Sequence, residues 1–291
     1  MKILILVLSS NTYPSKRNKN IQKKTWAKNL PKNIKVVFYS SGAKTTFSRD
    51  ELVVEASSSS YDIGYKNFKA FEWVLKNFEF DYLYRTNTSS FLNLSNLEKH
   101  IQNIQNAKSD LLYNGKILNL TKSDTNKKIK FVSGSGILFS KKSIELLTNN
   151  QEALNHNEWE DVAIGLLGEE LKIVPTEGSR FDIEGNIFNQ ITPLNQYHYR
   201  CRIDNHYGYP RFLETIVMRE LNRRHLENKE YNKKFLLSIY FEICKFFYIE
   251  NLTWKLVYKL KQFLNLFLPK KIYKILKIKL RNKLFQYFFK K

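Results

Sequence analysis

The sequence predicts an α/β protein in which helices cover both faces of a sheet. Short β-rich runs alternate with helix-compatible segments over about 200 residues, which is the pattern of an α/β sheet. The composition is 43% apolar and 14% aromatic, enough to fill a large core. Cys201 and Cys244 stand outside any CxxC pair, which argues against a disulfide framework and a structural zinc site. We therefore expect a single-sheet domain from a reducing compartment.

The pattern of apolar residues defines the first elements. Residues 3–8 form an apolar run that is short for a signal peptide and lacks a small-x-small cleavage site after it, so we expect a buried first strand. A polar helix at 16–30 and a strand at 34–41 follow. A second helix is predicted at 67–78, leading into a strand at 80–87. The apolar residues of this helix recur with helical spacing and are Phe68, Phe71, Val74, Leu75 and Phe78.

The alternation continues in the following segments. A helix is expected at 93–107, with Asn93 or Ser95 as its N-terminal cap. The next elements, in chain order, are strands at 110–115 and 129–140, helices at 141–150 and 157–171, and a last strand at 172–175. The series contains neither an internal repeat nor a long linker, so we expect one domain over residues 1–230.

The C-terminal residues 231–291 differ in character and are predicted to form a basic helical extension. They carry fifteen Lys or Arg residues against two acids, a net charge of +13 out of +21, so residues 1–230 carry +8. An apolar stripe with a spacing of four residues comprises Ile272, Leu276, Leu280, Leu284 and Phe288. A basic stripe beside it comprises Lys270, Lys274, Lys277 and Arg281. Such a helix fits an anionic membrane surface. The alternatives are packing on the domain, with lysines facing water, and a nucleic-acid clamp.

Polar clusters follow several of the predicted strands, where ligands bind in α/β sheets. These clusters are "SSNTYPSKR" at 9–17, "RTNTSSF" at 85–91, "SGSG" at 133–136 and "EWEDVAIG" at 158–165.

Four segments occur in the order seen in the β-1,3-glycosyltransferases of glycosyltransferase family 31, the galactosyltransferase and Fringe-like enzymes. They are "KNIQKKTW" (19–26), "YLYRTNTSSFLN" (82–93), "FVSGSGILFS" (131–140) and "EWEDVAIG" (158–165). They resemble the family's "IRxTW" block, "DDD…N" metal motif, "GxGYxxS" strand and "EDVxxG" helix start. The resemblance spans residues 1 to about 200. It implies a GT-A-like fold that binds a nucleotide-diphosphate sugar and transfers the sugar with inversion.

The resemblance also implies roles for individual residues. Asp161 would be the general base that deprotonates an acceptor hydroxyl, and Glu160 would orient the site. The alternative for both is an acidic helix N-terminus favoured by the helix dipole. Tyr65 and Asn67 match a family block that packs near the nucleotide. The residues expected to bind the donor are Ser9, Ser10, Arg17, Tyr65, Asn67, Arg85, Asn87, Thr88, Ser89, Gly134, Gly136, His198 and Arg200. The alternative for the two glycines is a bulged core strand. The alternative for His198 is an ordinary hydrogen-bonded histidine without a role in binding.

The family's three metal-binding acids fall on Asn87, Thr88 and Ser89. Neutral amide and hydroxyl oxygens hold a divalent ion much less well than carboxylates. No cofactor is therefore certain, and Mn²⁺ or Mg²⁺ is disfavoured. Cationic side chains would instead balance the leaving diphosphate, with Arg85, Arg200 and Arg202 as candidates. Acids elsewhere in the chain that would bind a metal are Asp81, Asp182 and Glu184. His206 is a weaker candidate than His198 for contact with the diphosphate or a metal.

Three functions remain in view. The first is an inverting, metal-independent glycosyltransferase of surface polysaccharide synthesis, with a glycan or lipid-linked acceptor. It would be cytoplasmic and peripheral on the inner face of the membrane. The second is a catalytically silent sugar-nucleotide or glycan binder. The third is a basic nucleic-acid-binding protein, motivated by a pI of about 9.7, although the chain carries no recognisable nucleic-acid motif.

Overall fold

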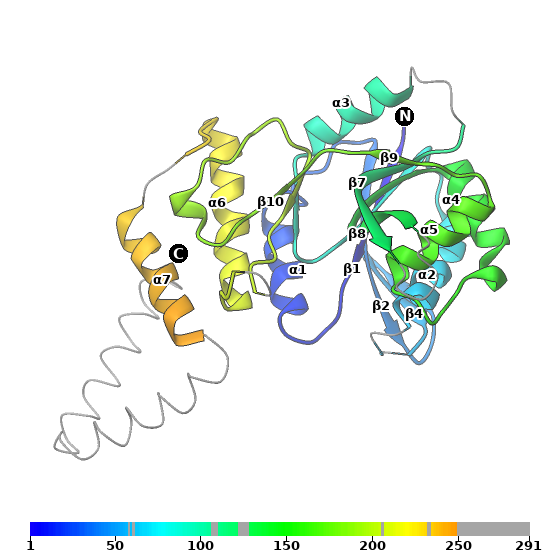
Figure 1. Ribbon diagram of the computed structural model, residues 1–291, viewed down its shortest axis with the longest axis horizontal. Helices are drawn as coiled ribbons and strands as arrows, with labels where there is room; N and C mark the ends of the chain where they lie inside the picture. The colour runs from blue at the N-terminus through cyan, green and yellow to red at the C-terminus, as the bar shows by residue number, and fades with distance from the viewer. Residues whose placement is uncertain are drawn as a thin grey trace, which may run out of the picture.

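The computed structural model describes residues 1–57, 59, 62–105, 110–121, 128–204, 207–231 and 234–248. Within these residues, eight strands form one mixed sheet with helices on both faces (Figure 1). The strand order is β3-β4-β2-β1-β5-β8-β7-β9. The strands are β1 (Ile3–Leu8), β2 (Ile34–Gly42), β3 (Thr46–Ser48), β4 (Glu51–Glu55), β5 (Tyr82–Asn87), β7 (Tyr113–Thr121), β8 (Lys128–Ser140) and β9 (Pro175–Glu177). The predicted α/β class is confirmed.

Strand β1 lies inside this sheet, parallel to β2 on one side and to β5 on the other. Its side chains alternate between two cores, as the strand period of two requires. Ile3, Ile5 and Val7 belong to one core, and Leu4 and Leu6 belong to the other. Burial on both faces is why this strand is a continuous apolar run.

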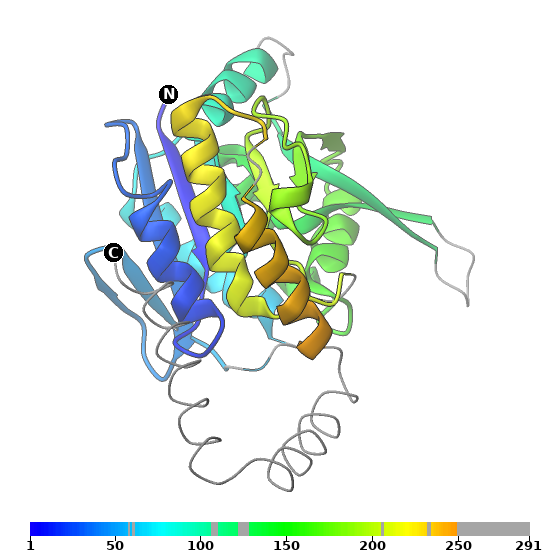
Figure 2. The same ribbon diagram turned by 90° about the vertical axis from the view of Figure 1, so that its left-hand side faces the viewer.

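Helices cover the two faces of the sheet in two groups. Helices α1 and α6 lie side by side over the first face (Figure 2), and α3 contributes to the same core. Helices α2, α4 and α5 pack against the second face. Their bounds are α1 (Ser15–Lys24), α2 (Ile63–Asn77), α3 (Leu94–Gln105), α4 (Lys141–Asn149), α5 (Glu160–Glu170) and α6 (Glu214–Glu227).

Most predicted elements are present, with shifted ends. Helix α1 ends at Lys24 rather than near residue 30, although Trp26 beyond its end is still buried. The side chain of Asn93 accepts a hydrogen bond from the backbone N–H of Asn96 at 3.1 Å, which confirms the predicted cap of α3. The last predicted strand, at 172–175, begins only at Pro175.

The expectation of a single, alternating sheet is wrong in two respects. Strand β8 runs antiparallel to both β5 and β7, so the large sheet is mixed. A second sheet has the order β10-β11-β6, with β6 (Ser90–Leu92), β10 (Arg180–Asp182) and β11 (His198–Arg200). Strands of three residues are too short to show a period in the sequence, so only tertiary pairing reveals them.

The predicted extension begins with helix α7 (Phe235–Tyr248), which packs on the domain. Phe241 is fully buried, and its ring lies 5.6 Å from that of Phe188. The apolar and basic stripes predicted beyond residue 270 lie outside the described residues. The boundary at residue 230 stays a prediction. Within the described part of the chain, no helix combines the length and apolar character needed to cross a bilayer.

Candidate active site

The polar clusters of the sequence meet at the carboxyl edge of the parallel strands. Leu8 at the end of β1 pairs with Asn87 at the end of β5, and Thr86 pairs with Gly136 of β8. The strand ends after Leu8 and Asn87 therefore lie beside the "SGSG" stretch of β8. Helix α5 joins them, because the backbone N–H of Gly134 donates to its Asp161. This edge is where α/β sheets bind ligands.

A buried polar network joins β2, α2, β5 and α5 at this edge. The guanidinium of Arg85 lies 2.9 Å from the carboxylate of Glu160, and Arg85 is only 2% exposed. Asn67 donates to the same carboxylate at 2.6 Å. The hydroxyl of Tyr39 donates to Asn67 and accepts from Nε of Arg85 at 3.2 Å. Although burial opposes its charge, the carboxylate of Glu160 raises the pKa of Arg85. Burial raises the pKa of Tyr39 to about 12, so the phenol keeps its proton.

Asp161, the second carboxylate at the start of α5, is held by two backbone N–H groups. Its Oδ2 accepts a hydrogen bond from the backbone N–H of Gly134 at 3.0 Å, and its Oδ1 accepts one from the N–H of Val162 at 3.1 Å. The side chain is partly exposed, and the two hydrogen bonds fix its orientation. An oriented and partly exposed carboxylate is suited to accept a proton.

The second sheet presents a polar face to the "SGSG" stretch. Arg180 and Asp182 of β10 pair in register with His198 and Arg200 of β11. Arg180 donates to the hydroxyl of Ser135 at 2.7 Å. The opposite face is aromatic, since Phe91, Phe181 and Tyr199 pack together there. The period of two thus places the charged residues of β10 and β11 on the face opposite the aromatic rings.

His198 lies inside this polar face and is 1% exposed. Its Nε2 is 3.0 Å from the hydroxyl of Ser90. Burial, aided by the charges of Arg180 and Arg200, holds its pKa well below the usual range, so the imidazole is neutral. Gly136 makes room for this ring, because a Cβ at Gly136 would overlap Nδ1 of His198 and the hydroxyl of Tyr84. Gly136 is therefore explained by side-chain packing, whereas Gly134 faces Glu160, Arg85 and Asp161.

Arg200 is a partly buried cation on the same face. Within the described part of the chain, its guanidinium has no hydrogen bond or ion pair. Burial lowers its pKa, Asp182 opposes this effect, and Arg180 and Arg202 add to it. A desolvated, unpaired arginine beside other cations is a strong point of attraction for an anionic ligand.

The side chains at the position of the family's metal motif are engaged within the protein. Ser89 donates to Oε2 of Glu214 at 2.8 Å and accepts from Arg211 at 2.7 Å. Thr88 bonds to Ser15 at 3.2 Å, and Asn87 accepts from the backbone N–H of Ser89 at 2.9 Å. The negative charge of Glu214 is neutralised by an ion pair with Arg211 at 2.7 Å. These residues do not fit a divalent cation, since an arginine lies against them and the described residues contain no cluster of three or more acidic, His or Cys ligands.

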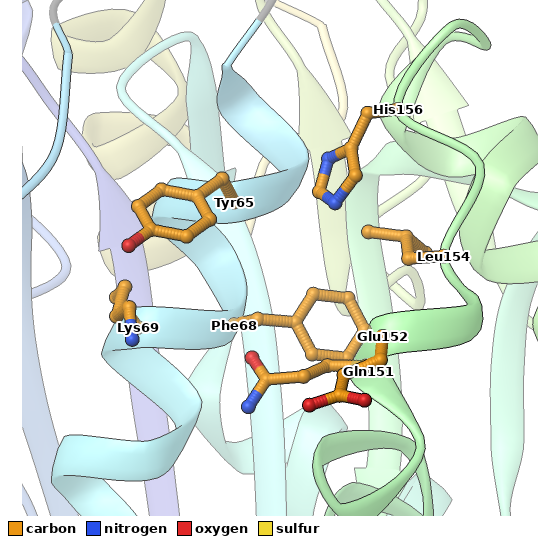
Figure 3. Close-up of a pocket in the computed structure, with 7 residues that line it drawn as sticks. All are labelled: Tyr65, Phe68, Lys69, Gln151, Glu152, Leu154 and His156. Atoms are coloured by element: carbon orange, nitrogen blue, oxygen red, sulfur yellow. The ribbon is translucent and has the colours of Figure 1, made fainter.

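Four other residues predicted to bind the donor make their contacts outside the hydrogen-bonded network of Arg85 and Glu160. Ser9 donates to the carbonyl of Tyr39 at 3.1 Å, and Ser10 bonds to Thr12. Arg17 lies over the ring of Phe212, 5.9 Å from its centroid. Tyr65 is on a different side of α2 from Asn67 and lines a pocket against the loop before α5 (Figure 3).

Two sequence expectations about charge need correction. Arg85 was expected to balance an anionic ligand, but its charge is neutralised by Glu160 in the interior. Arg202 is ion-paired with Asp204 at 2.9 Å.

Two of the acids named as alternative metal ligands have partners within the protein. Asp81 accepts a hydrogen bond from the backbone N–H of Lys2 at the opposite edge of the sheet, and Asp182 is ion-paired with Arg180 at 2.8 Å. His206 lies outside the described residues.

Sequence reasoning missed several residues of the site, because distant segments supply them. They are Tyr39, Lys66, Arg180, Arg211 and Glu214. Lys66 is 7% exposed, and its ammonium has no hydrogen bond or ion pair within the described residues. Burial lowers its pKa, with Asp62 opposing the effect. The one signal available for Lys66 was its place between Tyr65 and Asn67 in a motif already singled out.

Comparison with known proteins confirms the family expected from the motifs. Residues 41–178 match the family model described as galactosyltransferase. The match contains three of the four motif segments and begins after the first, residues 19–26. No curated protein matches the chain. A similar solved structure is described as a glycosyltransferase involved in the glycosylation of the major capsid of PBCV-1. It has 10% sequence identity and a TM-score of 0.47, and the match covers 76% of this chain and 100% of that chain.

Proposed function

Residues 41–178 match the galactosyltransferase family model, and on this premise we propose that the chain is an inverting, metal-independent glycosyltransferase. The donor would be a nucleotide-diphosphate sugar and the acceptor a hydroxyl of a glycan or lipid-linked glycan. The observation that carries the proposal is Asp161, a partly exposed carboxylate anchored by the N–H of Gly134 at 3.0 Å at the carboxyl edge of the sheet.

The proposed step is a single displacement in which Asp161 accepts the proton of the acceptor hydroxyl. The acceptor oxygen forms a bond to the anomeric carbon as the bond from that carbon to the donor phosphate oxygen breaks. The leaving nucleoside diphosphate keeps the electron pair of the broken bond. Glu160 does not compete for the proton, because Arg85 and Asn67 hold its carboxylate at 2.9 and 2.6 Å. It positions the start of α5 instead.

Arginines would stabilise the charge that develops on the leaving diphosphate. Arg200 is available for this role, because its guanidinium has no partner within the described residues. Arg211 lies at Ser89, where the family's metal motif would stand, but it is ion-paired with Glu214 at 2.7 Å and with Asp204 at 3.6 Å, so Arg200 is the main candidate for this role. Fixed cations in a desolvated site favour a developing anion without reorganisation.

The acceptor and the cellular place are proposed from the charge distribution. Residues 231–291 carry +13 of the total charge of +21, alternating with aromatic and aliphatic residues. Such a segment would hold the enzyme on an anionic inner membrane surface, where lipid-linked glycans are assembled. We therefore propose a role in surface polysaccharide synthesis.

The test measures donor hydrolysis and transfer across UDP-, GDP- and CMP-sugars, with Mn²⁺ and with EDTA. The proposal expects turnover that survives EDTA. Asp161→Asn should reduce turnover by roughly 10²- to 10⁴-fold while donor binding, measured by calorimetry, is kept. The matched control is Asp110→Asn, which alters an exposed acid paired with Lys142 at 2.8 Å and should keep full activity.

Two results would overturn parts of this proposal. Turnover only with Mn²⁺ would refute metal independence, while the proposed transferase activity would stand. Donor binding without turnover in the unaltered protein would favour the silent sugar-nucleotide binder.

A further inference from the structure

A pocket of about 270 Å³ lies between α2 and the segment that precedes α5 (Figure 3). Its lining residues are Tyr65, Phe68, Lys69, Gln151, Glu152, Leu154 and His156. The wall opposite α2 begins with the short helix η1 (Gln151–Ala153). The volume is below the roughly 300–1,000 Å³ of sites for drug-sized ligands, so the pocket suits a single ring better than a whole nucleotide sugar.

The pocket combines aromatic surface with free hydrogen-bonding groups. Phe68 is buried against the core, while the ring of Tyr65 is 41% exposed. The side chains of Glu152 and His156 are exposed and have no hydrogen-bond or ion-pair partner within the described residues. Figure 3 shows the rings of Tyr65 and His156 on opposite walls. This mixture matches a sugar ring, which has an apolar C–H face and a rim of hydroxyls.

The walls of the pocket are held together before any ligand binds. Glu72 of α2 accepts hydrogen bonds from Lys69 at 3.4 Å and from the side-chain amide of Gln151 on the other wall. The ammonium of Lys69 also lies over the ring of Tyr65, 5.2 Å from its centroid. A preformed site avoids the entropy cost of ordering its walls upon binding.

The charge of the lining argues against an anionic ligand. The one cation of the lining, Lys69, is paired with Glu72, and Glu152 adds a negative charge. A phosphate or nucleotide would meet no free positive charge here, in contrast to Arg200 at the other end of the site. A neutral ligand fits the balance better.

The pocket is directly connected to the proposed catalytic carboxylates. The lining segment runs from His156 through Trp159, which is 80% exposed, to Glu160 and Asp161. Asp161 is the fifth residue after His156, a span of at most roughly 18 Å. On the other wall, α2 places Asn67 on Glu160 at 2.6 Å. A glycan with its accepting hydroxyl at Asp161 would pass Trp159 to reach the pocket.

We propose that the pocket between α2 and residues 151–156 binds a neutral sugar ring of the acceptor glycan, one or more rings away from the accepting hydroxyl. The acceptor role rests on the proposed glycosyltransferase function, whereas the sugar-binding property rests on the pocket alone. Tyr65 supplies the stacking surface, and Glu152 and His156 bind the hydroxyls.

Binding is tested first, on the full chain without donor. The probes are methyl glycosides of glucose, galactose and N-acetylglucosamine, and lactose, followed by saturation-transfer NMR. At least one probe should bind. Its affinity should fall roughly 10-fold in Glu152→Ala and His156→Ala, as expected for loss of a hydrogen bond between a sugar hydroxyl and a carboxylate or an imidazole. The matched control, Glu145→Ala, removes an exposed acid on α4 outside the lining and should bind normally.

Kinetics then separate this proposal from the proposed function. In Glu152→Ala, the KM for an oligosaccharide acceptor should rise roughly 10-fold, with kcat and acceptor-free donor hydrolysis unchanged. Absence of donor hydrolysis in the unaltered protein would count against the transferase alone. Failure of every probe to bind, displacement of a bound probe by inorganic phosphate or UDP, or an unchanged KM in both variants would overturn the pocket assignment.

Discussion

At the scale of single residues, burial decides what each charged side chain can do. Arg85 and Arg200 both point toward the site, yet Arg85 is sealed in a 2.9 Å pair with Glu160 while Arg200 has no partner within the described residues. The same residue type therefore has a structural role in one place and is available to a ligand in the other.

The Arg85–Glu160 pair leads to a stability prediction. Arg85→Met would leave Glu160 as an uncompensated buried charge, so the free energy of unfolding should fall by about 3–5 kcal/mol. Urea unfolding followed by circular dichroism measures this change. Lys142→Met, which removes an exposed pair with Asp110, is the control and should leave the free energy of unfolding nearly unchanged. Equal losses in the two variants would contradict the role assigned to Arg85.

The buried histidines predict a dependence of stability on pH. Burial, with Arg180 and Arg200, holds the pKa of His198 well below its usual range, and burial lowers the pKa of His225 to about 4. In the unfolded chain both take up protons below about pH 6.5. The unfolded state then binds more protons, so the stability is fully present above about pH 6.5 and is lost as the pH falls below it.

Urea midpoints at about pH 7 and about pH 5 test this dependence. The midpoint should be lower at the acidic pH, and the difference between the two should shrink in His198→Asn and His225→Asn. A difference as large in both variants as in the unaltered chain would show that other groups cause the acid sensitivity.

At the scale of elements, the "SGSG" stretch of β8 is shaped by what crosses it. Gly136 lies under His198 of β11, and Gly134 lies against Glu160 and Asp161 of α5. The strand has no room for side chains at these two positions, because two other elements approach it closely there, which accounts for both glycines.

The packing around Gly136 predicts that its substitution affects the free energy of unfolding differently from the substitution of a glycine in α2. Gly136→Ala should lower the free energy of unfolding by about 1–3 kcal/mol, because the methyl group would overlap His198 and Tyr84. Gly64→Ala in α2 is the control. Its Cβ would lie 3.3 Å from the flexible end of Leu154, and alanine favours a helix over glycine by roughly 1 kcal/mol. Thermal unfolding compares them, and a Gly136→Ala protein as stable as the Gly64→Ala protein would disprove the packing argument.

At the scale of the whole molecule, helix α7 packs against the core of the domain. Glu242 accepts hydrogen bonds from Asn186 and Tyr209 at 2.9 Å each, and Phe241 is fully buried. A truncation at residue 231 would expose this core. The extension is therefore best removed after Tyr248.

Removal of residues 249–291 tests membrane attachment. This segment carries twelve basic residues and one acid, so the full chain should sediment with vesicles containing phosphatidylglycerol and the truncated chain should remain in solution. Neutral phosphatidylcholine vesicles are the control. Retention of binding by the truncated chain would place the membrane contact elsewhere. Salt-sensitive binding of the full chain to DNA, with none to vesicles, would favour the nucleic-acid alternative.

The sequence alone determined the α/β class, most elements of the large sheet and the resemblance to the galactosyltransferase family. These features depend on local periodicity and on motifs of a few adjacent residues, which are readable without a partner segment.

Only the tertiary structure decided the second sheet and the state of each charge. The pairing of Arg85 with Glu160 joins positions far apart in the chain, as does the contact of Ser89 with Glu214. The unpartnered state of Arg200 and the pocket beside Glu152 likewise depend on which segments pack together. Burial and pairing are properties of assembled surfaces, and a linear pattern does not contain them.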